Sequence, residues 1–150
     1  MSTELQFTES NEREFSAGGV VLRGDEVLVI VPTRRTPAGD RALALPKGHL
    51  EMDETAPQAA AREVREEAGV SGVVMESLGT VQYGYVRHGS QVQKTVEFFL
   101  IDYREGDPAD HDDEVQEARW MKLSEAATAL TFPGEREIIQ RLRSLRHESR

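Results

Sequence analysis

Three glutamates crowd the stretch REVREE: Glu63, Glu66 and Glu67. An α-helix turns about 100° per residue, so Glu67 falls about 40° to one side of Glu63 and Glu66 about 60° to the other. Carboxylates at this spacing repel one another, and a hard divalent cation with oxygen ligands would offset the repulsion. From these residues alone the alternative is a solvated acidic face, on which Arg62 relieves part of the repulsion.

Other side chains that commonly bind metals or act as nucleophiles are few. The chain has no cysteine and four histidines. Disulfides, thiolate metal sites and cysteine nucleophiles are therefore excluded, which leaves carboxylates and imidazoles as strong metal ligands. The histidines show no metal-ligand spacing, and we interpret them as loop or surface residues: His49, His88, His111 and His147.

A helix must present the three glutamates, and the sequence around them contains its end signals. Thr55 with Gln58 three residues later matches a capping box, and Pro57 is tolerated in a first turn. Gly69 suits a helix C-terminus. These signals predict a helix over about residues 56 to 68.

Runs of β-branched and aromatic residues predict the strands around this helix. Strands are predicted in FSAGGVVLR and EVLVIV with a turn at RGDE, in the short buried run ALALP, in VSGVVMESLGTVQYGYVRH and QVQKTVEFFLIDY with a turn at HGS, and in EARWMKL. Helices are predicted in SEAATAL and in GEREIIQRLRSLR, whose apolar residues fall near one face: Ile138, Ile139, Leu142 and Leu145. The pattern predicts an α/β domain with a mixed sheet, because two connections are hairpins.

Length and composition predict one globular domain. We expect residues 1–14, which are polar and acidic, to form a flexible lead-in, and residues 15–150 to form the domain. The chain has no apolar run near eighteen residues and no secretory signal pattern, so we expect no membrane span and a cytoplasmic location. A net charge of −9 argues against a nucleic acid polymer as partner. An anionic small molecule would need local cations.

The glutamates belong to a longer pattern of fixed spacing. It runs Gly48, five residues, Glu54, seven residues, Arg62-Glu63, an aliphatic residue, one residue, Glu66-Glu67, one residue, Gly69 and an aliphatic residue. This pattern resembles the Nudix box position for position, and FSAGGVVLR and ARWMKLSEA resemble the flanking strand and the start of a later helix in such proteins. The resemblance implies a Nudix α/β/α sandwich that hydrolyses a nucleoside diphosphate linked to another moiety, with Mg²⁺ as cofactor.

The resemblance also implies a role for each box residue. The ligands of Mg²⁺, or of Mn²⁺ in its place, would be the backbone carbonyl of Gly48 and the carboxylates of Glu63, Glu66 and Glu67. Arg62 would orient a glutamate through an ion pair. Glu54 would brace the loop near a helix N-terminus, where negative charge is favoured.

The general base is left open among three carboxylates. Glu114, six residues before Trp120, matches a downstream base or metal-binding glutamate of similar proteins, and Asp113 is its nearest rival. A box glutamate is the third candidate. An ordinary acidic loop is the alternative for DHDDE.

Substrate choice must come from residues outside the box. LPKGHLE resembles the form found in dinucleoside polyphosphate hydrolases, in which Lys47 would offer a cation to a phosphate. Such proteins tend to carry a tyrosine past the box that can stack on adenine, and Tyr85 lies near that place with Tyr83 on the same strand face. Ordinary core packing is the alternative for this pair. Further phosphate contacts could come from four basic residues: Arg34, Arg35, Arg87 and Lys94.

These observations order the candidate functions. The first is hydrolysis of a dinucleoside polyphosphate such as diadenosine tetraphosphate, and the alternative is hydrolysis of oxidised or ordinary nucleoside triphosphates. ADP-ribose follows, because members acting on it tend to carry a proline after the box and none lies between Pro57 and Pro108. A non-catalytic nucleotide-binding module comes last, since such domains usually lose box glutamates. Whether the protein forms a homodimer is left open.

Overall fold

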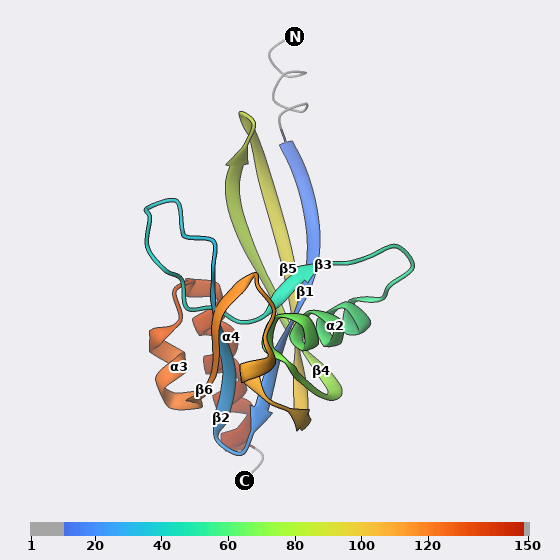
Figure 1. Cartoon of the computed structure of the whole chain (residues 1–150), viewed down its shortest axis with the longest axis vertical. Helices are drawn as coiled ribbons and strands as arrows, with labels where there is room; N and C mark the ends of the chain where they lie inside the picture. Colours follow the sequence, from blue (N-terminus) through green and yellow to red (C-terminus); the bar gives the residue numbers. More distant parts are fainter. Residues whose placement is uncertain (1–10, 149–150) are drawn as a thin grey trace.

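A mixed β-sheet carries helices on both faces (Figure 1). The computed structural model describes residues 11–148. The strands are β1 (Asn11–Arg23), β2 (Glu26–Pro32), β3 (Lys47–His49), β4 (Val70–Arg87), β5 (Ser90–Gly106) and β6 (Val115–Lys122). The helices are α2 (Ala56–Ala68), the 3-10 helix η1 (Pro108–Asp110), α3 (Leu123–Ala129) and α4 (Pro133–Glu148). The strand order is β4-β5-β1-β2-β6 with β3 on β1, and the β1–β5 pair is parallel. The predicted α/β class is confirmed.

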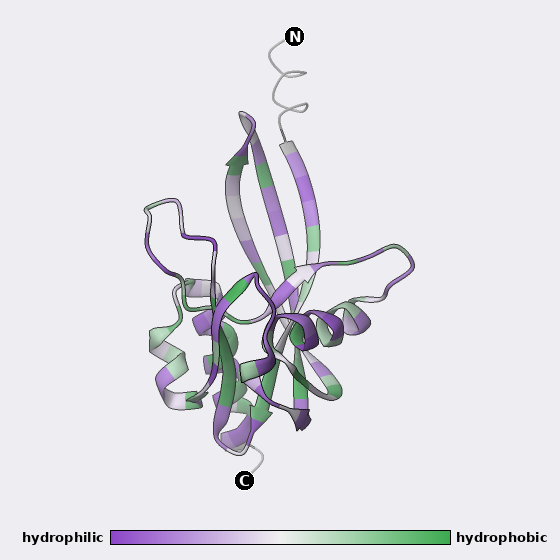
Figure 2. Cartoon of the chain, viewed as in Figure 1, coloured by the Kyte–Doolittle hydropathy of each residue, from purple (hydrophilic) through white to green (hydrophobic). Residues whose placement is uncertain are grey.

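Alternation along the strands sends neighbouring apolar residues to opposite faces of the sheet. In β5, Phe98 packs with α3 and α4, while Phe99 packs with α2. In β1, Val20 likewise packs on the side of α3 and α4, and Val21 packs on the side of α2. Figure 2 shows the apolar colour gathered where helices cover the sheet, and polar colour over much of the outer surface of α2. The sheet therefore lies between two apolar layers, and α2 turns its charged face outward.

The box helix forms as its end signals predict. The Thr55 side chain accepts from the Gln58 backbone N–H, and the Gln58 side chain accepts from the Thr55 N–H. Gly69 has a φ of 73° and closes the helix in the left-handed conformation that glycine adopts at low cost. The predicted range of 56 to 68 is confirmed.

Three details differ from the sequence prediction. Residues 11–14 were expected in the lead-in but belong to β1, because they pair with residues 91–94 of β5; residues 1–10 lie outside the described part. The run ALALP makes only one bridge, between Ala44 and Ile30, since Pro46 has no N–H to extend a ladder. Leu145 is 39% exposed, although the other three apolar residues of its helix face are buried.

The distal halves of β1, β4 and β5 extend beyond the helices as a three-stranded projection (Figure 1). The turn between β4 and β5 consists of His88 and Gly89, both with positive φ, which suits a two-residue hairpin. The strand β3, which carries the first residue of the box, pairs with β1 next to this projection. None of the helices within residues 11–148 is both long and apolar enough to cross a membrane.

Candidate active site

Two box glutamates contact adjacent residues of the short strand β3. Lys47 donates its backbone N–H to Glu67 Oε1 at 2.9 Å. The next residue, Gly48, lies directly against the Glu63 carboxylate, and a Cβ on Gly48 would collide with Glu63 Oε1, Oε2 and Cδ. Gly48 is therefore a glycine because a carboxylate occupies the space of its side chain. Glu63 and Glu67 therefore contact two consecutive residues, Gly48 and Lys47.

Arg62 is the centre of the hydrogen-bond network on α2. Its Nε and Nη2 donate to the two oxygens of Glu54 at 2.7 and 3.0 Å, and its Nη1 donates to Glu63 at 3.0 Å and to Glu66 at 3.1 Å. Its Nη2 also donates to the carbonyl of His49 at 2.9 Å. The hydrogen bonds that Arg62 donates to Glu54 raise the pKa of Arg62 further and lower the pKa of Glu54. Arg62 thus ties the box loop to the carboxylate face, as expected from the resemblance.

The two glutamates beside β3 are poorly stabilised as charged groups. Burial raises the pKa of Glu67 to about 8, and the nearby charge of Glu63 adds to this effect, although the Lys47 N–H opposes it. Burial also raises the pKa of Glu63, against the opposing charge of Arg62. A divalent cation between these carboxylates would reverse both effects, since it favours the charged forms.

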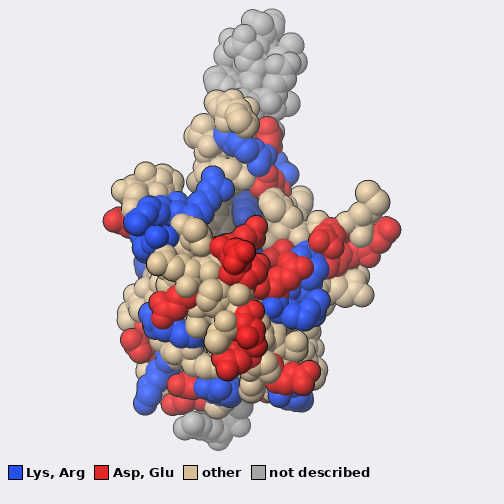
Figure 3. Space-filling model, viewed as in Figure 1, with Lys and Arg blue, Asp and Glu red and all other residues tan. Residues whose placement is uncertain are grey.

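The candidate ligands are of the chemical kind that binds a hard cation, but their side chains do not converge on one point. Within residues 11–148, no three acidic, histidine or cysteine side chains converge tightly enough to hold a metal as they stand. Glu63 and Glu66 instead point to Arg62. Figure 3 shows acidic side chains massed over the middle of the molecule beside α2, with basic side chains on the loop after β2. All ligands available here are oxygens, which suits Mg²⁺ or Mn²⁺, and their metal role stays a prediction.

The loop before β6 brings further carboxylates to the box. The charge of Glu114 contributes to the raised pKa of Glu63, and that of Asp112 contributes to the raised pKa of Glu67. The Asp112 N–H donates to the carbonyl of Glu66 at 3.1 Å, which holds this loop against α2. Both Glu114 and its rival Asp113 are exposed. Asp112 was not among the residues selected from sequence, where it stood within a run of acidic neighbours.

Lys47 lies in a buried network rather than free in the site. Its Nζ makes a 3.0 Å ion pair with Glu135 Oε2, and only 16% of its side chain is exposed. The hydroxyl of Tyr83 donates to the same Glu135 oxygen at 2.6 Å. The Tyr83 ring also packs edge-on against Phe132. Two of the predicted substrate-binding residues, Lys47 and Tyr83, therefore share one buried carboxylate.

Tyr85 is the exposed member of the tyrosine pair. Its hydroxyl donates to Glu14 at 2.7 Å, and this hydrogen bond lowers the pKa of Glu14. Arg34 lies near enough for its charge to affect Tyr85. Arg35 donates to the carbonyl of Gly39 within its own loop, at 3.0 Å. Tyr85 is thus within electrostatic reach of Arg34, and Arg35 is engaged in holding its loop.

Lys94 is a half-buried cation near the carboxylates. It pairs with Glu14 of β1 and with Tyr83 of β4 across the sheet. Within the described residues its ammonium makes no hydrogen bond or ion pair, and burial, then the charge of Lys47, lowers its pKa. The charges of Glu63 and Glu67 oppose that shift, so Lys94 is within electrostatic reach of the box. The sequence placed Lys94 only in a pool of four basic residues.

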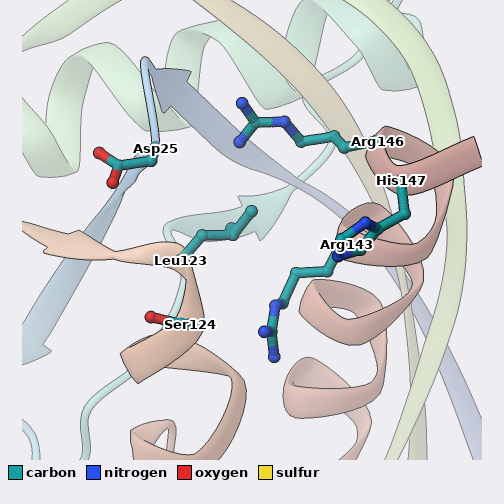
Figure 4. Close-up of a pocket in the computed structure, with 6 residues that line it drawn as sticks. All are labelled: Asp25, Leu123, Ser124, Arg143, Arg146 and His147. Atoms are coloured by element: carbon teal, nitrogen blue, oxygen red, sulfur yellow. The ribbon is translucent and has the colours of Figure 1, made fainter. Parts of the chain in front are cut away.

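A cavity of about 200 Å³ lies away from this site (Figure 4). It lies between the β1–β2 turn, the start of α3 and the last turns of α4. Its lining residues are Asp25, Leu123, Ser124, Arg143, Arg146 and His147. None of these residues belongs to the box, and basic residues in the last turn of a helix are favoured by its dipole.

A comparison with known protein families assigns most of the chain to one family. The family model described as "NUDIX domain" matches residues 12–142. The chain belongs to the Nudix family. The Nudix match takes in the sheet, the box helix and most of α4, so Glu135 lies within it as well as the box.

Individual relatives support the same assignment. The chain is 38% identical over 132 residues to "Putative mutator protein MutT4" of Mycobacterium tuberculosis, covering 85% of this chain and 53% of that protein. It is 36% identical over 98 residues to "8-oxo-(d)GTP phosphatase" of Mycolicibacterium smegmatis, covering 65% of this chain and 29% of that protein. A NUDIX hydrolase structure from Nitrosomonas europaea matches with a TM-score of 0.70 at 23% identity, over 89% of this chain and 90% of that one. The chain thus spans about half or less of these two curated relatives.

Glu135 is a second residue near the site, after Asp112, that sequence analysis missed. It precedes Ile138, Ile139 and Leu142 by three, four and seven positions, so it falls on the apolar stripe of α4. A charged residue within such a stripe signals a buried partner, because isolated buried charges are very costly. That signal was present in the sequence.

Proposed function

We propose that this Nudix protein hydrolyses a phosphoanhydride bond in a nucleoside polyphosphate with three or more phosphates, with Mg²⁺ as cofactor. The observation that carries the proposal is that Glu63 and Glu67 contact two consecutive residues of β3, Gly48 and Lys47. Burial is the main cause of the raised pKa values of Glu63 and Glu67, so the charged forms of both carboxylates are disfavoured in the protein alone. A bound divalent cation would favour the charged forms.

The residues that would hold the cation are the carbonyl of Gly48 and the carboxylates of Glu63, Glu66 and Glu67. When bound, Mg²⁺ supplies charge that offsets the phosphate oxygens and lowers the pKa of an attacking water. Arg62 holds Glu63 and Glu66 on one side, and the Lys47 N–H holds Glu67 on the other.

Glu114 is the proposed proton acceptor for the attacking water. It is exposed and lies near enough to Glu63 for the two charges to interact. An exposed carboxylate on a loop can approach a water molecule without breaking a core contact. Asp113 stays the rival, and its backbone carbonyl already accepts from the Thr33 hydroxyl at 3.2 Å.

Lys94 is the proposed contact for the phosphate chain. Lys47 is neutralised by Glu135, whereas the Lys94 ammonium has no partner among residues 11–148. A half-buried cation without a hydrogen-bond or ion-pair partner is costly, and a substrate phosphate would offset that cost. Because Lys94 lies on the sheet between the box and Tyr85, a longer phosphate chain would reach both.

Within this class, a dinucleoside polyphosphate such as diadenosine tetraphosphate is the first candidate. Tyr85 is 36% exposed and would stack on a base, while Arg34, whose charge acts on Tyr85, would contact a phosphate far from the box. Nucleoside triphosphates, oxidised or ordinary, are the second candidate. The relative named as an 8-oxo-(d)GTP phosphatase favours this second reading.

A substrate panel tests the proposal. Diadenosine tetraphosphate, dGTP, 8-oxo-dGTP and ADP-ribose are assayed with Mg²⁺ or Mn²⁺ and with EDTA. We expect kcat/KM for diadenosine tetraphosphate to exceed that for ADP-ribose by more than about tenfold, or roughly 1.4 kcal/mol. Cation-independent turnover, or a preference for ADP-ribose, would contradict the proposal.

Lys94→Met, with Lys122→Met on the exposed end of β6 as the matched control, tests the phosphate contact. We expect Lys94→Met to lower kcat/KM about tenfold or more for substrates with three or more phosphates, because it removes a charge beside the chain. The control should stay within about twofold. Equal values for the two variants would exclude Lys94 as the contact.

A further inference from the structure

Glu135 is a fully buried carboxylate at the start of α4, and all its partners lie on other elements. Its Oε1 accepts from the Leu45 N–H at 2.9 Å, and its Oε2 accepts from Lys47 Nζ at 3.0 Å and from the Tyr83 hydroxyl at 2.6 Å. Its side chain is 0% exposed. Tyr83 stays a neutral donor, because burial and the charge of Glu135 raise its pKa well above the ordinary value.

Lys47 is held on two sides at once. Its ammonium pairs with Glu135, and its backbone N–H donates to Glu67. The ammonium also lies 5.5 Å from the centre of the Tyr83 ring and 5.3 Å from that of Phe132. Lys47 therefore links Glu135 of α4 to the box glutamate Glu67.

The ammonium of Lys47 has a second possible partner. Its charge already acts on Glu67, whose carboxylate bonds to the backbone of the same residue. A lysine side chain has four rotatable bonds, so without Glu135 the ammonium can turn toward Glu67. A cation bound there would then have to displace it.

We infer that Glu135 is a positioning residue that holds the Lys47 ammonium away from Glu67, so that this box carboxylate stays free to bind a divalent cation. The inference rests on the proposed function, since it concerns the cation that the box would hold. Glu135 itself contacts neither Glu67 nor any other box glutamate in the hydrogen bonds and ion pairs of residues 11–148.

The first test is the affinity of the substrate-free protein for Mn²⁺, measured by calorimetric titration. We expect Glu135→Gln to weaken this affinity by about tenfold, in the range found when groups behind a metal ligand are removed. Glu137→Gln removes the same charge from an exposed position two residues along α4 and serves as the control. Its affinity should stay within about threefold of the wild type.

The second test is suppression. Lys47→Met in the Glu135→Gln background removes the displaced ammonium, so the double variant should regain wild-type Mn²⁺ affinity within about threefold. Lys47→Met alone leaves Glu135 buried without its counter-charge, so this variant should melt at a lower temperature than the double variant. A purely structural role for Glu135 would give no recovery of affinity in the double variant.

Unchanged Mn²⁺ affinity in Glu135→Gln, or a double variant that binds as weakly as Glu135→Gln, would overturn the inference while the proposed function stands. If Glu135→Gln does not fold, Glu135→Asp keeps the charge but withdraws it from Lys47, and its Mn²⁺ affinity should be weaker than that of the wild type. An Asp variant with wild-type affinity would overturn the inference as well. A wild-type protein that binds no Mn²⁺ would instead overturn the proposed function, and the inference with it.

Discussion

Gly48→Ala separates the activity of the site from the stability of the fold. The new Cβ would lie 2.6 Å from Glu63 Oε1 and closer to Oε2 and Cδ. These atoms are the far end of a flexible side chain, so the carboxylate must move by about 1 Å to reach ordinary contact distance. A misplacement of about 1 Å at a reacting centre can cost about a hundredfold in rate, or roughly 2.7 kcal/mol.

Stability should change little in the same variant. The backbone at Gly48 does not need a positive φ, and replacing such a glycine reduces the freedom of the unfolded chain. We expect the free energy of unfolding to stay within about 1 kcal/mol of the wild type. Gly18→Ala is the matched control, because Gly18 pairs with Lys47 and its Cβ would meet Phe98 and the Pro46 carbonyl, both at 2.6 Å. That variant should lose about 1–3 kcal/mol through overpacking.

Steady-state hydrolysis at saturating Mg²⁺ and urea unfolding would be measured on both variants. The expected result is a Gly48→Ala protein that is folded and about a hundredfold slower, beside a Gly18→Ala protein that is less stable. Turnover within about threefold of the wild type in folded Gly48→Ala would refute the role given to the Glu63–Gly48 contact.

Three further outcomes are expected. The folded-state pKa of Glu67 is about 8 against an ordinary value of 4.5, so its stabilising contribution is full below pH 4.5 and is lost as the pH rises through 8. In EDTA the melting temperature should therefore fall from pH 5 to pH 8 more in the wild type than in Glu67→Gln, and Mg²⁺ should raise the melting temperature more at pH 8. Glu114→Gln should lower kcat by roughly ten- to a thousandfold, and a silent Glu114→Gln beside a crippled Asp113→Asn would move the base one residue earlier. Tyr85→Ala should raise KM more than it lowers kcat for diadenosine tetraphosphate, and an unchanged KM would favour the nucleoside triphosphate candidate.

The box helix could be predicted to the residue because its signals are local. Thr55, Gln58 and Gly69 act within a few positions of the ends that they set, and no distant contact is needed to interpret them. The strands followed from their apolar and β-branched runs in the same way. The run ALALP was predicted wrongly as a strand, because its burial comes from packing and its backbone makes a single bridge with Ile30.

The candidate site was only partly accessible to sequence reasoning, because charge pairing across the fold is not local. Lys47 and Lys94 lie on two strands, β3 and β5, that both pair with β1, and nothing near either lysine in sequence tells which one is neutralised. The answer depends on Glu135, which is 88 residues from Lys47.

A charged residue in an apolar helix stripe predicts a partner buried with it. Glu135 had to find a cation or several donors inside the fold, since a lone buried carboxylate is too costly. Lys47, directly before the box, pairs with Glu135, whereas the Lys94 ammonium makes no hydrogen bond or ion pair within residues 11–148. One buried pair therefore decides which lysine belongs to the fold and which stays available for an anionic substrate.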